Sequence, residues 1–297
     1  MSSVAERAAL VKSDLIDHIA RVELRVRDID KALSFYRDVV GLKVSEQSAD
    51  RASLGTTEIP TFLNLTSSGV TAPADPRATG LFHTAIRFPT RPSLGDALAR
   101  LAHAGMEIGA GDHLVSEALY IDDPDGNGVE LYWDRPVEDW PPPAGDMITP
   151  MATLPVDLQS LLNDGSRENA VDVPAPSGTD IGHVHLQVSD VDATTRFYRD
   201  QVGLDLTARL GNAAAFFSSN GYHHHIGTNT WRTAGRKPAS REQAGLDRVA
   251  FTVSSETALN DLSDRLNSSG IQVSRDGGDL VVHDPDGIEL RFMCFVQ

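Results

Sequence analysis

Alternating hydrophobic and polar positions open each quarter of the chain. Residues 20–28 alternate in this way, which predicts a half-buried strand because successive side chains of a strand point to opposite faces. The next segment, DIDKALSFYRDVVG, places Ile29, Leu33 and Tyr36 at helical spacing and ends at Gly41, a good helix terminator. The short runs LKVSEQ, RASLG and TFLNLTS then predict three strands. Together these elements make a βαβββ module.

The same order of elements returns three times. LFHTAIRF predicts a strand, LGDALARLAHAG a helix that ends at Gly105, and MEIGAG, EALYIDD and GVELYWD three strands, with PDGNG as a hairpin turn. The pattern begins again at residue 181 and at residue 245. We therefore predict an α+β fold of four βαβββ modules.

Internal repeats show that the chain consists of two related halves. Residues 22–44 and 184–206 share V-x-L-x-V-x-D, FYRD and VGL at the same spacing, and DPDGNGVELYW resembles DPDGIELRF. A segment rich in Pro, Gly and Asp lies between the halves and predicts a connection, with a short helix in ATLPVDLQSLL. The predicted divisions are an N-terminal domain of two modules (15–135), a linker (136–178) and a C-terminal domain of two modules (179–297).

Composition narrows the class of protein. The chain has 26 Lys and Arg against 42 Asp and Glu, and its formal net charge of −16 repels nucleic acid phosphates and anionic lipids. We therefore expect neither as a partner. The single cysteine, Cys294, cannot form an internal disulfide. Because the N-terminal residues lack a long apolar run and no stretch approaches membrane-spanning length, we expect a cytoplasmic protein.

Three consecutive histidines, His223, His224 and His225, stand in the segment GYHHHIGTNTW. On a strand, at most His223 and His225 would share a face. The run alone is therefore not expected to supply three ligands to one metal, and the rest of a site must come from elsewhere.

The chain resembles the vicinal oxygen chelate superfamily and, more closely, extradiol ring-cleaving dioxygenases of the catechol 2,3-dioxygenase type. The resemblance spans residues 15–293 and rests on GLFHTAIRF, GDHLVSEALYIDDPDGNGVELYWDRP, IGHVHLQVSD and GYHHHIGTNTW. It implies that modules pair into cup-shaped mixed sheets and that the protein is a homo-oligomer. It also implies that metal ligands lie on the first and last strands of a module, facing into the cup.

Only two of the four modules offer suitable ligands at these positions. The first-strand positions are Arg21, His83, His183 and Arg248, and the last-strand positions are Asn64, Glu130, one member of the histidine run and Glu289. An arginine has no lone pair to donate to a metal. We therefore predict that His83, Glu130 and His183, from modules two and three, form a metal site across the two halves. A site that uses Glu289 in module four is the alternative. Modules one and four would form a second, metal-free cup, and His185 is the alternative to His183.

Two histidines and one carboxylate form a facial triad with open positions, which is typical of non-haem Fe(II) oxygenases. We expect Fe(II), with Mn(II) as the alternative. The resemblance implies insertion of O2 into a small aromatic diol, a catechol, next to the two hydroxyls to give a muconic semialdehyde-type product. It assigns acid/base catalysis to His224, with His225 as the alternative. It also assigns a hydrogen bond to substrate to Tyr120, and substrate contacts to His113 and His225.

Other functions stay open at this point. A glyoxalase-like enzyme of the same superfamily would use a redox-inert metal and a fuller set of ligands. A non-enzymatic binding protein would hold a small molecule in the cup and need no triad. The histidine run alone is also compatible with nickel or zinc storage. The ring substituents of a catechol substrate are not specified by the sequence.

Overall fold

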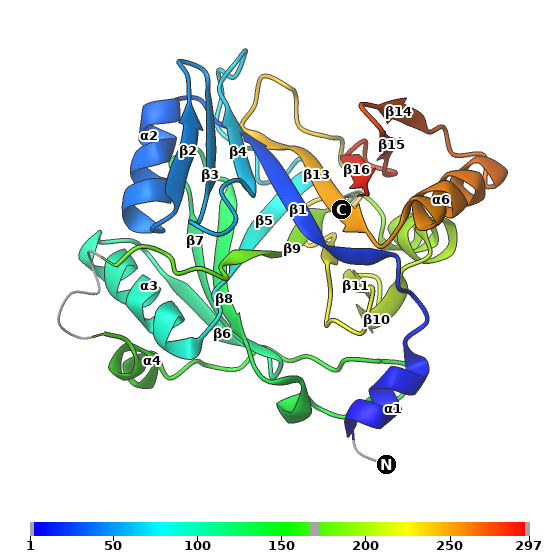
Figure 1. Cartoon of the computed structure of the whole chain (residues 1–297), viewed down its shortest axis with the longest axis horizontal. Helices are drawn as coiled ribbons and strands as arrows, with labels where there is room; N and C mark the ends of the chain where they lie inside the picture. The colour runs from blue at the N-terminus through cyan, green and yellow to red at the C-terminus, as the bar shows by residue number, and fades with distance from the viewer. Residues whose placement is uncertain (1–2, 167–172, 295–297) are drawn as a thin grey trace.

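The computed structural model of the protein describes residues 3–166 and 173–294 (Figure 1). Residues 167–172 of the expected linker and residues 295–297 of the expected C-terminal domain lie outside the described residues. Within this part of the chain no helix combines the length and the apolar character that a membrane crossing needs.

Each module has the predicted order of strand, helix and three strands. Module one contains β1 (Ile16–Arg25), α2 (Ile29–Leu33), β2 (Lys43–Gln47), β3 (Arg51–Gly55) and β4 (Leu63–Thr66). Module two contains β5 (Gly80–Arg87), α3 (Arg91–His103), β6 (Gly109–Asp112), β7 (Ser116–Asp122) and β8 (Gly128–Asp134). Module three contains β9 (Asp180–Gln187), α5 (Val191–Thr195), β10 (Asp205–Leu210), β11 (Ala214–Ser218) and β12 (Ile226–Asn229). Module four contains β13 (Gly245–Val253), α6 (Glu256–Ser268), β14 (Ser274–Asp276), β15 (Asp279–His283) and β16 (Glu289–Met293).

Additional helical segments extend or connect the modules. The helices of modules one and three continue as π-helical segments, and an N-terminal helix precedes module one. These elements are α1 (Ser3–Leu10), η1 (Ser34–Val39), η2 (Val137–Asp139), α4 (Leu158–Asp164) and η4 (Arg196–Val202). The predicted helix in ATLPVDLQSLL is thus confirmed as α4.

A polar side chain caps the start of each module's helix. Asp28, Thr90, Asp190 and Ser255 each accept a hydrogen bond from a backbone N–H in the first turn. Such a cap typically stabilises a helix by about 1 kcal/mol. Asp28 and Asp190 are the aspartates of the repeated V-x-L-x-V-x-D pattern, so this part of the repeat is explained by helix capping.

In the described part of the chain the strands form two mixed sheets of eight strands, and each sheet takes one module from each half of the sequence. The strand orders are β14-β15-β16-β13-β1-β4-β3-β2 and β10-β11-β12-β9-β5-β8-β7-β6. Modules one and four meet at the antiparallel pair β1–β13, and modules two and three meet at β5–β9 (Figure 1). The predicted pairing of modules two and three is confirmed. Because 15–135 and 179–297 each contribute to both sheets, their division into two domains stays a prediction from the repeat.

The repeated FYRD and DPDG motifs bind to each other within each half. The Tyr36 hydroxyl donates to Asp123 Oδ2 at 3.1 Å, and Tyr198 donates to Asp284 Oδ2 at the same distance. All four side chains are buried. These hydrogen bonds join modules one and two, and modules three and four, so both motifs have a structural explanation.

The linker runs across the sheet of modules two and three and reaches both of its edge strands. Thr149 N–H donates to Thr207 O on β10, and Leu154 exchanges backbone hydrogen bonds with Asp112 on β6. Because β10 and β6 are the two ends of this sheet, the linker closes over its concave side.

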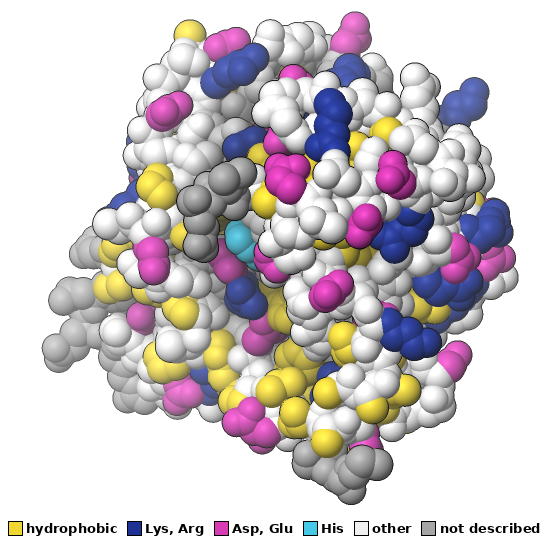
Figure 2. Space-filling model, turned by 45° about the vertical axis from the view of Figure 1, so that its right-hand side comes forward, with side chains coloured by type: hydrophobic (Ala, Val, Ile, Leu, Met, Phe, Trp, Pro, Cys, Tyr) yellow, Lys and Arg dark blue, Asp and Glu magenta, His cyan; other side chains and the backbone are white. Residues whose placement is uncertain are grey.

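One face of the molecule carries charges of both signs. On the face in Figure 2, acidic and basic side chains are interspersed, and hydrophobic side chains gather on its lower part. This face lacks a continuous basic stripe of the kind that phosphate backbones bind. The expectation that nucleic acid is not a partner stays a prediction.

Candidate metal centre

His83, Glu130 and His183 meet at the centre of the sheet formed by modules two and three. They come from β5, β8 and β9, and their potential ligand atoms all lie within 4.8 Å of one another. His83 Nε2 lies 2.8 Å from Glu130 Oε2, and His183 Nε2 lies 3.2 Å from the same oxygen. None of the three residues is more than 5% exposed. The three predicted ligands are therefore neighbours in space, although they are distant in sequence.

The geometry of this cluster fits a divalent metal better than a set of ordinary hydrogen bonds. Although His83 Nε2 is close to Glu130, the two atoms are not aligned as a hydrogen bond, and this nitrogen is buried without a hydrogen-bond partner. Buried polar atoms are rarely left unpaired unless a ligand, an ion or water completes them. Two imidazole nitrogens and a carboxylate oxygen that converge in this way suit Fe(II), Mn(II) or a similar ion.

The protonation states of the cluster also suit metal binding. Burial alone would raise the pKa of Glu130, but the His183 and His83 imidazoles hold it well below its usual range. Burial lowers the pKa of His183 to about 4, although Glu130 partly opposes this shift. A metal needs a carboxylate and a neutral imidazole. Glu130 and His183 are therefore already in their ligand forms at neutral pH.

His185, the alternative ligand on β9, occupies a different place from His183. It is not part of the converging cluster, its ring packs against His83, and its Nε2 atom is buried without a partner. Gly227 lies beside this ring, since a Cβ at Gly227 would approach within 3.0 Å of it. His185 therefore lines the cavity next to the cluster, while His183 is the histidine that meets Glu130.

Strand register corrects two of the predicted last-strand positions. In module two, Glu130 on the last strand pairs with Ala85 on the first strand, two residues after His83. In module three, the residue two positions after His183 is His185, and it pairs with Gly227 on the last strand. The last-strand position of module three is thus a glycine and not a member of the histidine run. The cup formed by modules two and three, called the first cup below, therefore has no side-chain ligand at this position.

The expected position of Glu289 in module four is also wrong. Tyr120 pairs with Glu130 in the hairpin of module two, and the equivalent pair in module four is Val281 with Arg291. Arg291 therefore takes the place of Glu130, and Glu289 lies two residues earlier, where it accepts a hydrogen bond from Arg291 at 2.8 Å.

The second cup consequently presents three arginines and one asparagine at its four ligand positions: Arg21, Asn64, Arg248 and Arg291. Its cavity measures about 570 Å³. Glu23 and Glu289 form ion pairs with these guanidinium groups, among them Arg21 with Glu23 at 3.2 Å. This cup contains an ion-pair network where the first cup contains histidines.

The histidine run is not a strand, which corrects the expected alternation of its side chains. Asn220 and Gly221 have positive φ angles of 54° and 75°, and the three histidines follow this turn before β12 begins. The imidazoles of His223 and His224 consequently lie beside each other, with their Nδ1 atoms 2.7 Å apart. His225 points elsewhere, and its Nδ1 accepts from the backbone N–H of Ser219 at 3.3 Å.

Only one member of the run lines the cavity above the cluster. His224 does so, and its ring centroid lies 4.2 Å from that of His183. Burial and the neighbouring histidines lower the pKa of His224 well below its usual value. His225 is absent from the cavity wall. His224 is therefore the histidine of the run that a bound molecule can contact.

Tyr120 and His113 form a hydrogen-bonded pair in the same cavity. The Tyr120 hydroxyl lies 2.6 Å from His113 Nε2, and His113 Nδ1 lies 2.8 Å from the carbonyl oxygen of Ala152 in the linker. Since a carbonyl can only accept, Nδ1 donates to it, and neutral His113 accepts from Tyr120. Burial and the nearby charge of Glu130 raise the pKa of Tyr120 well above its usual value, so the phenol keeps its proton.

The cavity measures about 480 Å³ and is walled largely by apolar side chains. They include Phe82, Met147, Met151, Leu210, Phe216 and Trp231. No lysine or arginine is among the described residues that line it. The linker residues Met147 and Met151 also line the cavity, and nothing in the sequence pattern marks them, because neither side chain is a candidate metal ligand or acid/base group.

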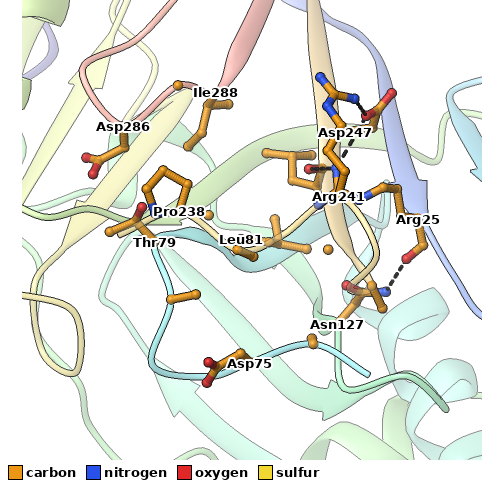
Figure 3. Close-up of a pocket in the computed structure, with 18 of the residues that line it drawn as sticks. Arg25, Asp75, Thr79, Leu81, Asn127, Pro238, Arg241, Asp247, Asp286 and Ile288 are labelled. Atoms are coloured by element: carbon orange, nitrogen blue, oxygen red, sulfur yellow. Dashed lines mark hydrogen bonds and ion pairs between the residues drawn. The ribbon is translucent and has the colours of Figure 1, made fainter. Parts of the chain in front are cut away.

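A further cavity lies where the two sheets meet (Figure 3). It measures about 110 Å³, and its walls include Arg25, Thr79, Asn127 and Asp247. The Asn127 side-chain amide donates to the carbonyl oxygen of Arg25 at 3.3 Å. No histidine is among the described residues of this wall. The histidine and glutamate side chains of the predicted metal site thus lie in the cup formed by modules two and three.

Comparison with known proteins agrees with the fold and the repeat. Residues 15–131 and 180–292 match the model of the Glyoxalase/Bleomycin resistance protein/Dioxygenase superfamily. The chain belongs to this superfamily. The predicted family and the fold of four modules are confirmed.

Two curated members of the superfamily are similar in sequence. The chain is 37% identical to the catechol-2,3-dioxygenase of Bacillus subtilis (strain 168) over 272 aligned residues. The alignment covers 90% of this chain and 94% of that protein. It is 33% identical over 120 residues to biphenyl-2,3-diol 1,2-dioxygenase 3 of Rhodococcus globerulus, covering 39% and 63% of the two chains. The structure of glyoxalase I from Zea mays shares the fold, with a TM-score of 0.54, 16% identity, and coverage of 93% and 91%.

Proposed function

We propose that this protein is an extradiol ring-cleaving dioxygenase that inserts O2 into a catechol next to its two hydroxyls. The product would be of the muconic semialdehyde type. The observation that carries this proposal is the buried cluster of His83, Glu130 and His183 at the floor of an apolar cavity of about 480 Å³. Similarity to a Bacillus subtilis catechol-2,3-dioxygenase along most of the chain supports it.

The proposed cofactor is Fe(II), with Mn(II) as the alternative because both ions accept imidazole and carboxylate ligands. His83 and His183 would hold the ion through Nε2, and Glu130 through a carboxylate oxygen. Bound there, iron would supply adjacent positions for both catechol oxygens and O2 and a path for electrons between them.

His224 is proposed as the acid/base residue. It lines the cavity beside His183, and its depressed pKa keeps its imidazole neutral at pH 7. A neutral imidazole can take a proton from a substrate hydroxyl and return it later in the reaction. Because His225 lies outside the cavity wall, we leave it out of both the catalytic and the substrate-binding set.

Tyr120 and His113 are proposed to contact the substrate, with the Tyr120 oxygen accepting a hydrogen bond from a substrate hydroxyl. Both line the cavity, and their mutual hydrogen bond, together with the bond from His113 to Ala152 O, holds the two rings in place. Since the linker supplies Ala152, it positions these two residues as well as covering the cavity.

The wall of the cavity favours catechols that are unsubstituted or carry apolar substituents. A ring carboxylate would be buried there without a lysine or arginine to pair with it. Burying a charge without a partner is costly, and even an unpaired neutral polar group costs about 2–7 kcal/mol. We therefore propose alkyl- or aryl-substituted catechols as substrates ahead of carboxylated ones.

A glyoxalase-like activity is the less favoured alternative. Such enzymes use a fuller set of protein ligands, whereas Gly227 takes the fourth ligand position in this cup. A triad with open positions is better suited to binding two substrates on the metal, as an oxygenase requires.

The proposal can be tested with full-length protein loaded anaerobically with Fe(II). On mixing with catechol and oxygenated buffer, we expect one O2 consumed per catechol, with the yellow absorbance of a semialdehyde. 4-Methylcatechol should be cleaved with a higher kcat/KM than 3,4-dihydroxybenzoate. Iron bound at one equivalent without oxygen uptake on any catechol would refute the dioxygenase function. Isomerisation of a hemithioacetal by the same sample would favour the alternative.

A further inference from the structure

A half-buried carboxylate, Asp134, lies on the same strand as the proposed metal ligand Glu130. Residues at i, i+2 and i+4 of a strand share one face, so β8 presents Glu130, Tyr132 and Asp134 to the same side. The first of these belongs to the metal cluster. Asp134 lies beyond it, on the side of the turn that holds the histidine run.

Asp134, His223 and His224 form a continuous hydrogen-bonded chain. Asp134 Oδ1 lies 2.8 Å from His223 Nε2, and His223 Nδ1 lies 2.7 Å from His224 Nδ1. His223 is fully buried, so neither of its ring nitrogens has water as an alternative partner. The chain thus leads from the carboxylate to the histidine that lines the cavity.

Hydrogen-bond chemistry fixes where the protons lie along this chain. A carboxylate can only accept, so His223 Nε2 must donate to Asp134. A neutral His223 then has its lone pair on Nδ1, and the contact between the two Nδ1 atoms requires His224 to donate. His224 therefore carries its proton on Nδ1, and its Nε2 keeps the lone pair.

Neighbouring groups hold the Asp134 carboxylate ionised and oriented. Tyr222 donates to Oδ2 at 2.8 Å, and Arg87 lies 3.5 Å from the same oxygen. Burial would raise the pKa of Asp134, but His223 and Arg87 lower it below its usual value. Oδ2 is thus occupied, which leaves Oδ1 for His223.

The turn itself is held by the adjacent strand. Thr207 on β10 donates its hydroxyl hydrogen to the carbonyl oxygen of His223 at 2.7 Å. With its backbone and both ring nitrogens bonded, His223 has one orientation available, and it transmits that constraint to His224.

We propose that His223 and Asp134 are positioning residues that select the tautomer of His224 with a free Nε2, the form needed to accept a substrate proton. This inference rests on the proposed function, in which His224 is the base. In hydrolase triads a carboxylate likewise fixes the tautomer of the histidine base, although there it bonds that histidine directly.

The tautomer can be measured without any turnover. Full-length protein labelled with ¹⁵N-histidine and loaded with diamagnetic Zn(II) would be observed by two-bond ¹H–¹⁵N correlation spectra, with His224 assigned from the His224→Gln spectrum. We expect a protonated Nδ1 and an unprotonated Nε2 for His224. A proton on Nε2 in the wild-type protein would overturn the proposal, whatever the enzyme's activity proves to be.

Kinetics of the iron-loaded enzyme provide the second test. In Asp134→Asn the side-chain amide can donate to His223, which permits the opposite tautomer of both histidines. We expect kcat to fall by about 10²-fold or more, the scale of acid/base contributions, with KM and bound iron unchanged. In the labelled protein, the ¹⁵N signals of His224 should shift towards a protonated Nε2.

Asp180→Asn is a matched control, because Asp180 pairs with Arg87 at 2.7 Å but has no bond to the histidines. It should retain the wild-type tautomer and kcat. Equal losses of kcat in both variants would mean that the carboxylates act only through Arg87 and would overturn the proposal. If Asp134→Asn does not fold, the wild-type spectrum alone still decides it. Failure of the proposed function would be seen separately, as no oxygen uptake with a His224 tautomer that is nonetheless as expected.

Discussion

The buried carboxyl group of Asp284 should make the free energy of unfolding depend on pH, and Asp284→Asn should remove this dependence. Burial, assisted by the charge of Asp286, raises the pKa of Asp284 to about 7, despite hydrogen bonds from Ile288 N–H, Asp286 N–H and the Tyr198 hydroxyl. In the unfolded chain an aspartate titrates near 3.9. Between about pH 4 and pH 7 the unfolded chain therefore releases this proton while the folded protein retains it.

The direction of the pH dependence of stability follows from this difference in pKa. Because its pKa is raised in the folded state, Asp284 makes its full contribution to stability below about pH 4. That contribution is lost as the pH rises to 7. About three pKa units at about 1.4 kcal/mol each give a cost of about 4 kcal/mol above pH 7. Asp284→Asn keeps an acceptor for the two backbone N–H groups and presents an amide to the Tyr198 oxygen, but it carries no charge. The variant should thus escape this cost.

Urea unfolding of both proteins at intervals from pH 4.5 to pH 8 measures the effect. We expect the stability of Asp284→Asn relative to the wild type to rise steadily with pH and to level off near pH 7.5. Taking the difference between the two proteins removes the titration of the buried histidines, which is common to both. A difference that stays constant across this range would mean that folding does not raise the pKa of Asp284.

Three further predictions concern the site and its surroundings. Glu130→Gln should lose stoichiometric iron in metal analysis, since a neutral amide is a poorer ligand, whereas Glu289→Gln in the other cup should retain it; the reverse result would contradict the assignment of the site. Gly182→Ala would place a Cβ 1.7 Å from the Tyr132 hydroxyl, so the free energy of unfolding should fall by about 1–3 kcal/mol. Adding Tyr132→Phe should recover only part of that loss, because the ring carbon Cζ would still lie 2.9 Å from the new Cβ and the hydrogen bond to the Tyr222 hydroxyl would be lost; no change in urea unfolding of Gly182→Ala would refute this. Met151→Arg supplies the cation that the cavity wall lacks, so kcat/KM for 3,4-dihydroxybenzoate relative to 4-methylcatechol should rise at least tenfold, and an unchanged ratio would contradict the proposed selectivity.

The fold was largely predictable because its signals are local and repeated. Alternation in the first strands, helical spacing in DIDKALSFYRDVVG and the DPDG turns recur in the sequence and give the order of elements. The pairing of modules two and three was predictable for a different, chemical reason. Arg21 and Arg248 cannot bind a metal, which left His83, His183 and Glu130 as the consistent set, and the strand order confirms that pairing.

Glu289 does not take the place of Glu130, because the two DPDG turns align without a gap. Matching the glutamates of DPDGNGVE and DPDGIE removes two residues from the second segment. Both turns have the same length in the structure, since Asp123 N–H donates to Asn127 O and Asp284 N–H donates to Ile288 O. The ungapped match aligns Glu130 with Arg291.

The path of the histidine run depends on a turn that the sequence does signal. Asn220-Gly221 is a dipeptide typical of turns with positive φ angles, and it bends the chain immediately before His223. On a strand, His223 and His224 would point to opposite faces, whereas after this turn their rings contact each other. The contributions of Met147, Met151 and Ala152 were not predictable, because the course of a linker over a sheet depends on tertiary contacts at its two ends.

The most direct test of the central claim follows both oxygen atoms of O2 into the product. Iron-loaded enzyme would be mixed with 4-methylcatechol under ¹⁸O2, and the ring-opened product would be trapped by reduction before its aldehyde exchanges with water, then analysed by mass spectrometry. We expect a ring opened outside the diol, with one label in the carboxylate and one in the former aldehyde. A product with one label or none, or a ring opened between the two hydroxyls, would contradict it.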